Sequence, residues 1–228
     1  MKLQRFISIF FILSISFQIC LGQTLPKSNL VFEFEKVIND ELLAIVDSFM
    51  IILNKNNSNG YVVLYGTNKN PTAKYINKRR IEGCFLSRKY SSKNISFVFI
   101  QDKDKVGGQF WEIPKDAVKP EFNEVPQDYK ITNLSEPNLI YKVNNDNDYC
   151  PIHFDLQFYS LFLNANPEIV GKIVIYEKTI GNYRREKQKY LQELTKKHKI
   201  LPKQIKFVRG KYNLDIDAEF WLVPAKKK

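Results

Sequence analysis

Apolar and polar positions follow one another along the chain in short blocks, which predict strands and helices in turn. The phrases GYVVLY at 60–65 and GKIVIY at 171–176 are almost continuously apolar. Such runs are typical of strands with little solvent contact on either face. Residues 30–34 and 139–143 predict a further strand at the start of each half, and the first of these alternates apolar and acidic side chains.

Apolar residues at helical spacing predict helices between these strands. In the first half they are Leu42, Ile45, Val46, Phe49 and Leu53, and in the second half Ile152, Leu156, Tyr159 and Leu163. Pro151 suits the start of the latter helix. A second helix is expected after each long strand, over 72–89 and 183–198.

The two halves of the chain repeat the same apolar phrases in the same order. QFWEIP at 109–114 returns as EFWLVP at 219–224, and these phrases hold both tryptophans of the chain. ISFV at residue 95 likewise returns as IKFV at residue 205. Three phrases at nearly constant spacing indicate an internal duplication.

The order of elements predicts an α/β protein of two tandem units, each an α+β sandwich. Each unit reads β-α-β-α-β-β or β-α-β-α-β, which places two helices on a small mixed sheet. We assign unit one to 30–115 and unit two to 138–224. The polar, proline-containing stretch 116–137 is the expected linker, and 225–228 is a basic tail.

The first 22 residues have the pattern of a secretory signal peptide. Lys2 and Arg5 precede an uncharged run from Phe6 to Phe17, and small residues stand at the expected cleavage site after Gly22. The run is shorter than the ~20 residues of a spanning helix. We therefore expect an exported protein, periplasmic or extracellular, without a transmembrane segment after cleavage. The alternative is an uncleaved anchor.

The chain is basic, and the charge is widely spread. Loss of Lys2 and Arg5 from 35 basic residues leaves 33 against 24 acidic ones. A well-solvated surface explains this pattern, and weak attraction to an anionic polymer or membrane surface is the alternative. Export makes nucleic acid an unexpected partner.

The first unit resembles the OmpA-like, peptidoglycan-associating domain. The resemblance rests on VFEFEKV at 31–37, GYVVLYGT at 60–67 and INKRRIEG at 76–83, and more loosely on YRREKQKYL at 183–191. It implies that each unit is OmpA-like and that the chain is similar to bacterial secreted proteins with two such units. It also implies peptidoglycan, or another envelope protein, as partner.

The resemblance further implies a ligand site made by an acidic residue after the second strand and an arginine on the next helix. The two hold the ammonium and a carboxylate of a wall-peptide residue. Arg80 with Asn68 would fill these roles in unit one, and Arg185 with Glu177 in unit two. Asn68 keeps an acceptor without the charge of the family's aspartate. The alternative is that both arginines are solvated helix residues.

Motifs of enzyme chemistry are missing from the sequence. His153 and His198 have no partner at metal-ligand spacing, and neither a nucleophile elbow nor a phosphate loop occurs. We expect no cofactor and no enzymatic activity. The function expected is that of an exported binding or structural protein of the envelope, and the alternative is a protein–protein interaction module with an exposed sheet edge. Cys84 and Cys150 remain after cleavage and could form a disulfide, if the fold brings them together.

Overall fold

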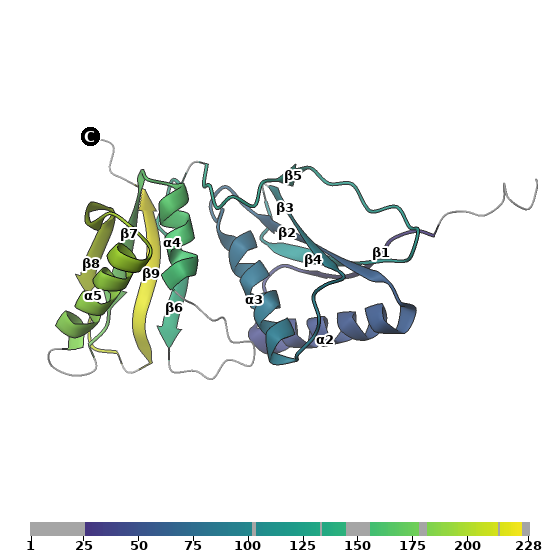
Figure 1. Cartoon of the computed structure of the whole chain (residues 1–228), viewed down its shortest axis with the longest axis horizontal. Helices are drawn as coiled ribbons and strands as arrows, with labels where there is room; N and C mark the ends of the chain where they lie inside the picture. The colour runs from purple at the N-terminus through teal and green to yellow at the C-terminus, as the bar shows by residue number, and fades with distance from the viewer. Residues whose placement is uncertain are drawn as a thin grey trace, which may run out of the picture.

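The computed structural model describes residues 26–101, 104–132, 134–144, 156–177, 182–213 and 215–224. The expected signal peptide, the basic tail, Cys150 and His153 lie outside the described residues. Within them, the protein is α/β with two mixed sheets that lie side by side, each with its own helices (Figure 1). The predicted fold class is therefore confirmed.

The first sheet has the strand order β1-β4-β2-β3-β5. Its strands are β1 (Asn29–Phe34), β2 (Asn59–Gly66), β3 (Ile95–Gln101), β4 (Gly107–Ile113) and β5 (Glu124–Val125). Strand β2 runs parallel to β3 and antiparallel to β4. Strand β2 is buried over nearly its whole length, as its continuous apolar run predicted.

The second sheet has the order β6-β9-β7-β8. Its strands are β6 (Asn138–Asn144), β7 (Ile169–Ile175), β8 (Ile205–Arg209) and β9 (Ile216–Pro224). Strands β6, β7, β8 and β9 stand in the same order and directions as β1, β2, β3 and β4.

The register of the two sheets matches residue by residue. Trp111 lies opposite Leu30 and Tyr61, and Trp221 lies opposite Leu139 and Lys172. In both sheets the edge strand β1 or β6 carries an irregularity directly after this leucine. Residues of β2, β3 and β4 therefore have counterparts in β7, β8 and β9, whereas β5 has none in the described second sheet and β6 has a further irregularity between Val143 and Asn144.

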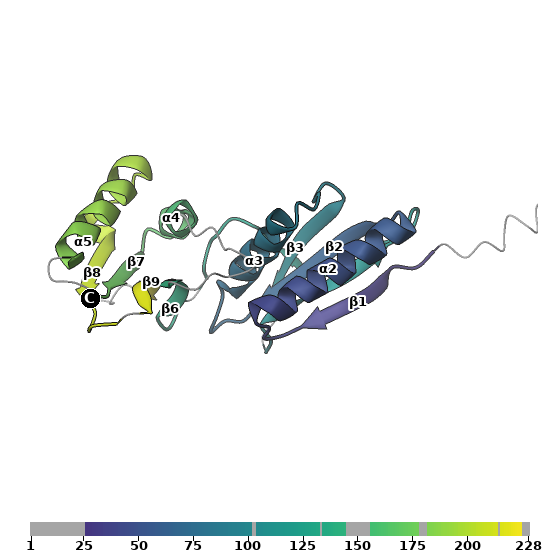
Figure 2. The ribbon, with the colours of Figure 1, turned by 90° about the horizontal axis from the view of Figure 1, so that it is seen from below.

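Each sheet carries two helices on one face (Figure 2). They are α2 (Asn39–Asn56) and α3 (Ala73–Ser87) on the first sheet, and α4 (Leu156–Ala165) and α5 (Asn182–Gln192) on the second. Helix α2 buries Leu42, Val46, Phe49 and Leu53, which is the stripe expected from the sequence. It ends at Asn57, whose φ of 48° lies in the left-handed region that asparagine tolerates.

The helix expected over 183–198 changes its geometry before its end. Residues Glu193–Lys197 form a π-helical turn after α5. The side chains of α5 are not fully buried, whereas Leu194 in the π turn is completely buried. The wider turn thus carries the apolar anchor that attaches this helix to the core.

The Phe-Trp phrase divides its two rings between the faces of the sheet, because successive side chains of a strand point to opposite sides. Phe110 and Phe220 are fully buried beneath the helices. Phe110 meets Phe49 with a ring-centroid separation of 5.0 Å, and Phe220 meets Tyr159 at 5.3 Å. The tryptophans consequently face away from the helices.

A glycine lies near the start of the second strand of each unit because a helix packs directly on it. A Cβ atom on Gly60 would lie 2.9 Å from Leu53 Cδ1, and one on Gly171 would lie 2.6 Å from the hydroxyl oxygen of Tyr159. Gly60 and Gly171 are counterparts in the register. The shared glycine is thus explained by close helix–strand approach.

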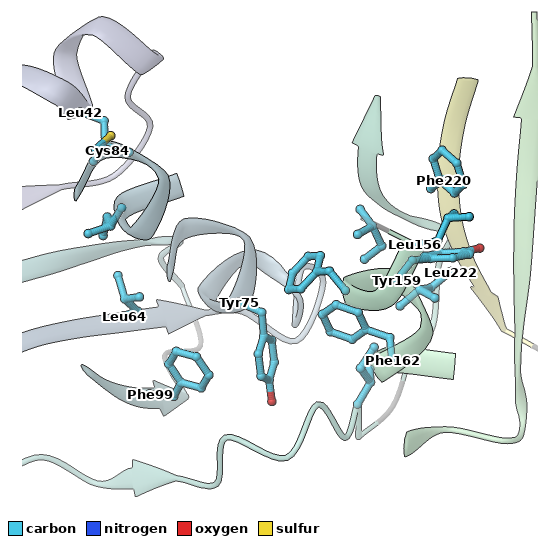
Figure 3. Packing of buried hydrophobic residues seen from close by; sticks show 14 of the residues in the cluster. Leu42, Leu64, Tyr75, Cys84, Phe99, Leu156, Tyr159, Phe162, Phe220 and Leu222 are labelled. Atoms are coloured by element: carbon cyan, nitrogen blue, oxygen red, sulfur yellow. The ribbon is translucent and has the colours of Figure 1, made fainter. Parts of the chain in front are cut away.

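The apolar core is continuous between the two units (Figure 3). Tyr75 of α3 meets Phe162 of α4 at a ring-centroid distance of 5.3 Å, edge to face. Tyr129 stacks on Tyr75 at 4.8 Å and meets Phe162 edge-on at 5.2 Å. Such pairs contribute about 0.5–1.5 kcal/mol each beyond the area they bury.

Two asparagines add polar contacts across the same junction. Asn138 Nδ2 donates to the carbonyl of Lys69 at 3.3 Å, and its Oδ1 accepts from the hydroxyl of Thr72. Asn166 Oδ1 accepts the backbone N–H of Ile131 at 2.8 Å, and its Nδ2 donates to the carbonyl of Tyr129 at 2.9 Å. The junction is thus both apolar and hydrogen-bonded.

The first part of the segment 116–137, which was predicted as a linker, is packed against the first unit. We name residues 116–127 the strap, which crosses the face of the first sheet opposite α2 (Figure 1). Phe122 of the strap packs between Tyr61 and Trp111, and β5 pairs antiparallel with β3. Apolar side chains such as Phe122 pack this segment on the sheet, although its prolines and polar residues predicted an unpacked linker.

Glu112 anchors the first Phe-Trp strand to the loop before β2. Its side chain is buried and accepts hydrogen bonds from Asn56 at 2.7 Å, Ser58 at 3.0 Å and Asn29 at 3.4 Å. Burial acts to raise the pKa of Glu112, but these three donors outweigh it and lower the pKa below its usual value. The counterpart of Glu112 in the second sheet is Leu222, which is fully buried.

We predict that Glu112→Gln lowers stability in a pH-dependent way. A lowered folded-state pKa stabilises the fold above the usual carboxyl pKa, and this contribution is lost as pH falls through the folded value. Urea unfolding should show a loss of about 1–2 kcal/mol at neutral pH that shrinks toward pH ~3. The exposed Glu168→Gln serves as control. A loss that stays constant over this pH range would contradict the assignment.

Candidate functional site

Arg80 lies on α3 and fastens the loop that precedes α2. Its Nη2 donates to the carbonyl of Val37 at 2.7 Å and to Asn39 Oδ1 at 2.9 Å, and its Nε donates to the same Asn39 oxygen at 3.1 Å. A hollow of about 410 Å³ lies beside it, lined by Ile38, Asn39, Asp40 and Arg80. The guanidinium is thus hydrogen-bonded mainly to the chain at the start of α2, through the Val37 carbonyl and the Asn39 side chain.

Asn68 occupies a different place, in the loop after β2. It is exposed, and its Oδ1 accepts a hydrogen bond from Gln101 Nε2 at 3.3 Å. Gln101 ends β3, and it also donates to the carbonyl of Gly66 at 3.3 Å. The structure therefore joins Asn68 to the ends of two parallel strands and does not hydrogen-bond it to Arg80.

In the second unit, Arg185 lies on the outside of α5. Its side chain is 77% exposed, and its hydrogen bonds among the described residues are local, to Asn182 Oδ1 at 2.7 Å and to Glu186 Oε1 at 3.4 Å. Exposed pairs of this kind contribute little to stability. The solvated alternative therefore describes Arg185 well, whereas Arg80 is held in hydrogen bonds.

Glu177 pairs with Arg209 and not with Arg185. Arg209 donates from Nε at 2.9 Å and from Nη2 to one oxygen, Oε2, of the Glu177 carboxylate. The two residues stand at the ends of β7 and β8, which run parallel and so bring their carboxyl ends together. The sequence analysis did not single out Arg209, because its pairing with Glu177 depends on the contact between β7 and β8.

The four ligand-site residues that the resemblance implied, Asn68, Arg80, Glu177 and Arg185, thus make separate contacts. A zwitterionic ligand needs one unpaired cation and one unpaired anion at a fixed separation. In unit one the arginine is bonded to a loop, and in unit two the glutamate is bonded to another arginine. The described residues bring neither pair together as a clamp.

The junction between the units forms a further hollow, of about 140 Å³. Arg79 lies over the ring of Phe158 there, at 5.9 Å from the centroid. The hollow is lined by Tyr75, Lys78, Arg79, Glu82, Tyr129, Gln157, Phe158 and Leu161. Its lining comes from both units and from segment 116–137, so no single stretch of sequence signals it.

Lys74 is a buried cation that the sequence did not single out. Burial lowers its pKa, and Asp128 opposes this effect. The ammonium lies 5.5 Å from the ring centroid of Tyr75 and 5.9 Å from that of Phe99, and 3.5 Å from Gln101 Oε1. These contacts are those of a cation held by aromatic faces at the strand ends.

The outer face of the second sheet, which lies opposite its helices, centres on Trp221. Lys172 lies over the Trp221 ring at 5.8 Å from the centroid. Trp221 Nε1 donates to Glu219 Oε2 at 3.0 Å, and Lys142 Nζ lies 3.2 Å from Glu219 Oε1. The pattern of the strands predicts a half-buried face here, and Trp221 is indeed partly exposed.

Cys84 is fully buried on α3 and is disulfide-bonded. The other two cysteines of the chain, Cys20 and Cys150, both lie outside the described residues. The pairing of Cys84 with Cys150 therefore stays a prediction.

The part of the chain that the structure describes holds neither a cluster of metal ligands nor a helix suited to span a membrane. No group of three or more His, Cys, Asp or Glu residues there is placed to hold a metal ion. No helix there has the length and apolar character needed to cross a membrane.

Comparison of the chain with family models, curated proteins and solved structures found no match.

We predict that the two candidate arginines differ sharply in their effect on stability. Arg80→Ala should cost about 2 kcal/mol, because the Val37 carbonyl and Asn39 lose charge-assisted hydrogen bonds. Arg185→Ala is the matched control and should change stability by less than about 0.5 kcal/mol. Arg80→Lys should fall between them, since lysine keeps the charge without the planar fork. Urea unfolding of the three variants measures this, and equal losses at both sites would refute the assignment.

Proposed function

We propose that the protein is an exported, non-enzymatic binding or structural protein of the cell envelope or extracellular space. It is built of two OmpA-like units that arose by duplication. Its partner is another protein rather than the peptide of the cell wall.

The matched register of the two sheets supports the duplication. Strand order, strand direction and the irregularity in the edge strand all recur. Two unrelated sheets would have no reason to share an irregularity at the same step beside the Phe-Trp strand. The first unit has the order β-α-β-α-β-β, which is one of the two orders that the apolar pattern of the sequence predicted.

The existing hydrogen bonds of Arg80 and Glu177 are the main reason to propose a protein partner rather than the wall peptide. Wall-peptide binding in unit one would require Arg80 to give up the Val37 carbonyl and Asn39. In unit two it would require Glu177 to leave Arg209. Leaving a partly buried charged group without its partner costs free energy that a weak ligand contact would first have to offset.

The shared core supports action as a single body. The aromatic junction and the hydrogen bonds of Asn138 and Asn166 hold the two sheets in one arrangement. A rigid pair of sheets presents faces and edges of fixed geometry, which are the features that protein partners use in strand addition and face packing.

Sedimentation with purified peptidoglycan tests this proposal. We expect the wild type, Arg80→Ala and Arg185→Ala all to stay in the supernatant. Cross-linking in the native envelope or extracellular fraction should give an adduct of defined mass with another protein. The proposal fails if the wild type pellets with peptidoglycan and either arginine variant releases it, or if no defined protein adduct forms.

A further inference from the structure

The strap shows what the outer face of such a sheet binds. In the first unit, Phe122 stacks on Tyr61 at a ring-centroid distance of 6.3 Å and meets Trp111 edge-on at 6.0 Å. Two residues later, Glu124 accepts a hydrogen bond from the Tyr61 hydroxyl at 2.8 Å. The strap thus contacts the outer face through one aromatic ring and one carboxylate.

The strap also covers the edge of the first sheet. Residues 124 and 125 pair antiparallel with Ile100 and Phe99 of β3, and Gln127 Nε2 donates to the Phe97 carbonyl at 2.8 Å. An edge strand left alone presents unpaired backbone groups that attract a further strand. Here the chain supplies that strand itself.

The second sheet offers the same face without a described cover. Matching by register places Val174 at the position of Val63, Val208 at that of Val98, and Trp221 at that of Trp111. Among the described residues, no ring contacts Trp221 and no strand pairs with the outer edge of β8. Of these three counterparts, Val208 and Trp221 are partly exposed, whereas Val174 is buried.

We propose that the outer face of the second sheet and the β8 edge bind an extended acidic segment of another protein. That segment carries an aromatic residue two positions before a carboxylate, as the strap carries Phe122 before Glu124. Its ring packs on Trp221 and its backbone pairs antiparallel with β8. This inference rests on the proposed function and names the chemistry of the partner.

The charges of the face favour an acidic occupant. Lys172 takes the register position of Tyr61, so a carboxylate placed like that of Glu124 meets an ammonium instead of a hydroxyl. Lys206 on β8 is exposed and adds a second positive charge at the edge. The strap itself is acidic, with Asp116, Glu121 and Glu124 against Lys119. Complementary charge of this kind sets partner choice and association rate.

A synthetic peptide of the strap sequence, residues 116–127, is the probe. The full chain with Trp111→Phe keeps Trp221 as its only tryptophan, and the peptide contains none, so fluorescence reports the proposed face. The chain's own strap is tethered and excludes the peptide from the first unit. We expect a saturable change in Trp221 emission.

Variants of the peptide test the assignment without any effect on folding. Phe122→Ala or Glu124→Lys in the peptide should each weaken binding by about tenfold or more, because each removes one of the two anchors. Lys206→Glu in the chain should weaken binding of the unchanged peptide, and Lys196→Glu on the π turn is the matched control that should leave it unchanged.

Three results would overturn the inference. The first is a titration that does not saturate up to about 1 mM peptide. The second is equal affinity for the original and the altered peptides. The third is a concentration-dependent dimer of the chain alone that Lys206→Glu dissociates. The last would assign the face to a second copy. A protein adduct in the cross-linking experiment together with a failed peptide titration would leave the proposed function standing and reject only this site.

Discussion

A continuous apolar core runs from the first sheet to the second through Tyr75, Tyr129 and Phe162. Each sheet with its two helices is small, and small units bury a lower fraction of their surface than large ones. Sharing a core across the junction adds burial that neither unit has alone. It also packs half-buried Tyr129, from the segment between the units, against rings of both units.

The fold followed from local patterns, because these patterns record burial directly. Continuous apolar runs marked β2 and β7 as central strands, and the Phe-Trp phrase marked the strand whose two faces differ. The strap, Tyr129 and the pair of Glu177 with Arg209 depend on contacts between distant segments, which no local period records. The candidate site was the least predictable part. The resemblance matched Arg80 by residue type, but its hydrogen bonds depend on which residues lie next to it, here Val37 and Asn39.

The two units share most of their core positions and differ in what lies over and beside the sheets. Phe110 and Phe220 occupy equivalent places in the core, and Gly60 and Gly171 allow the same helix approach. In contrast, the counterpart of Glu112 is Leu222, and the counterpart of Tyr61 is Lys172. One outer face is covered by the strap and the other is basic and partly exposed. The proposed binding role therefore rests on the difference between the two units and not on their likeness.

The most direct test of the shared core is equilibrium unfolding in urea of two variants, Trp111→Phe and Trp221→Phe, each followed by its remaining tryptophan and by circular dichroism. Trp221 reports the second sheet and Trp111 the first. A shared core predicts that within each variant the fluorescence and circular dichroism transitions coincide, as in two-state unfolding. Separate transitions for the tryptophan of one sheet and for the rest of the chain would contradict the account.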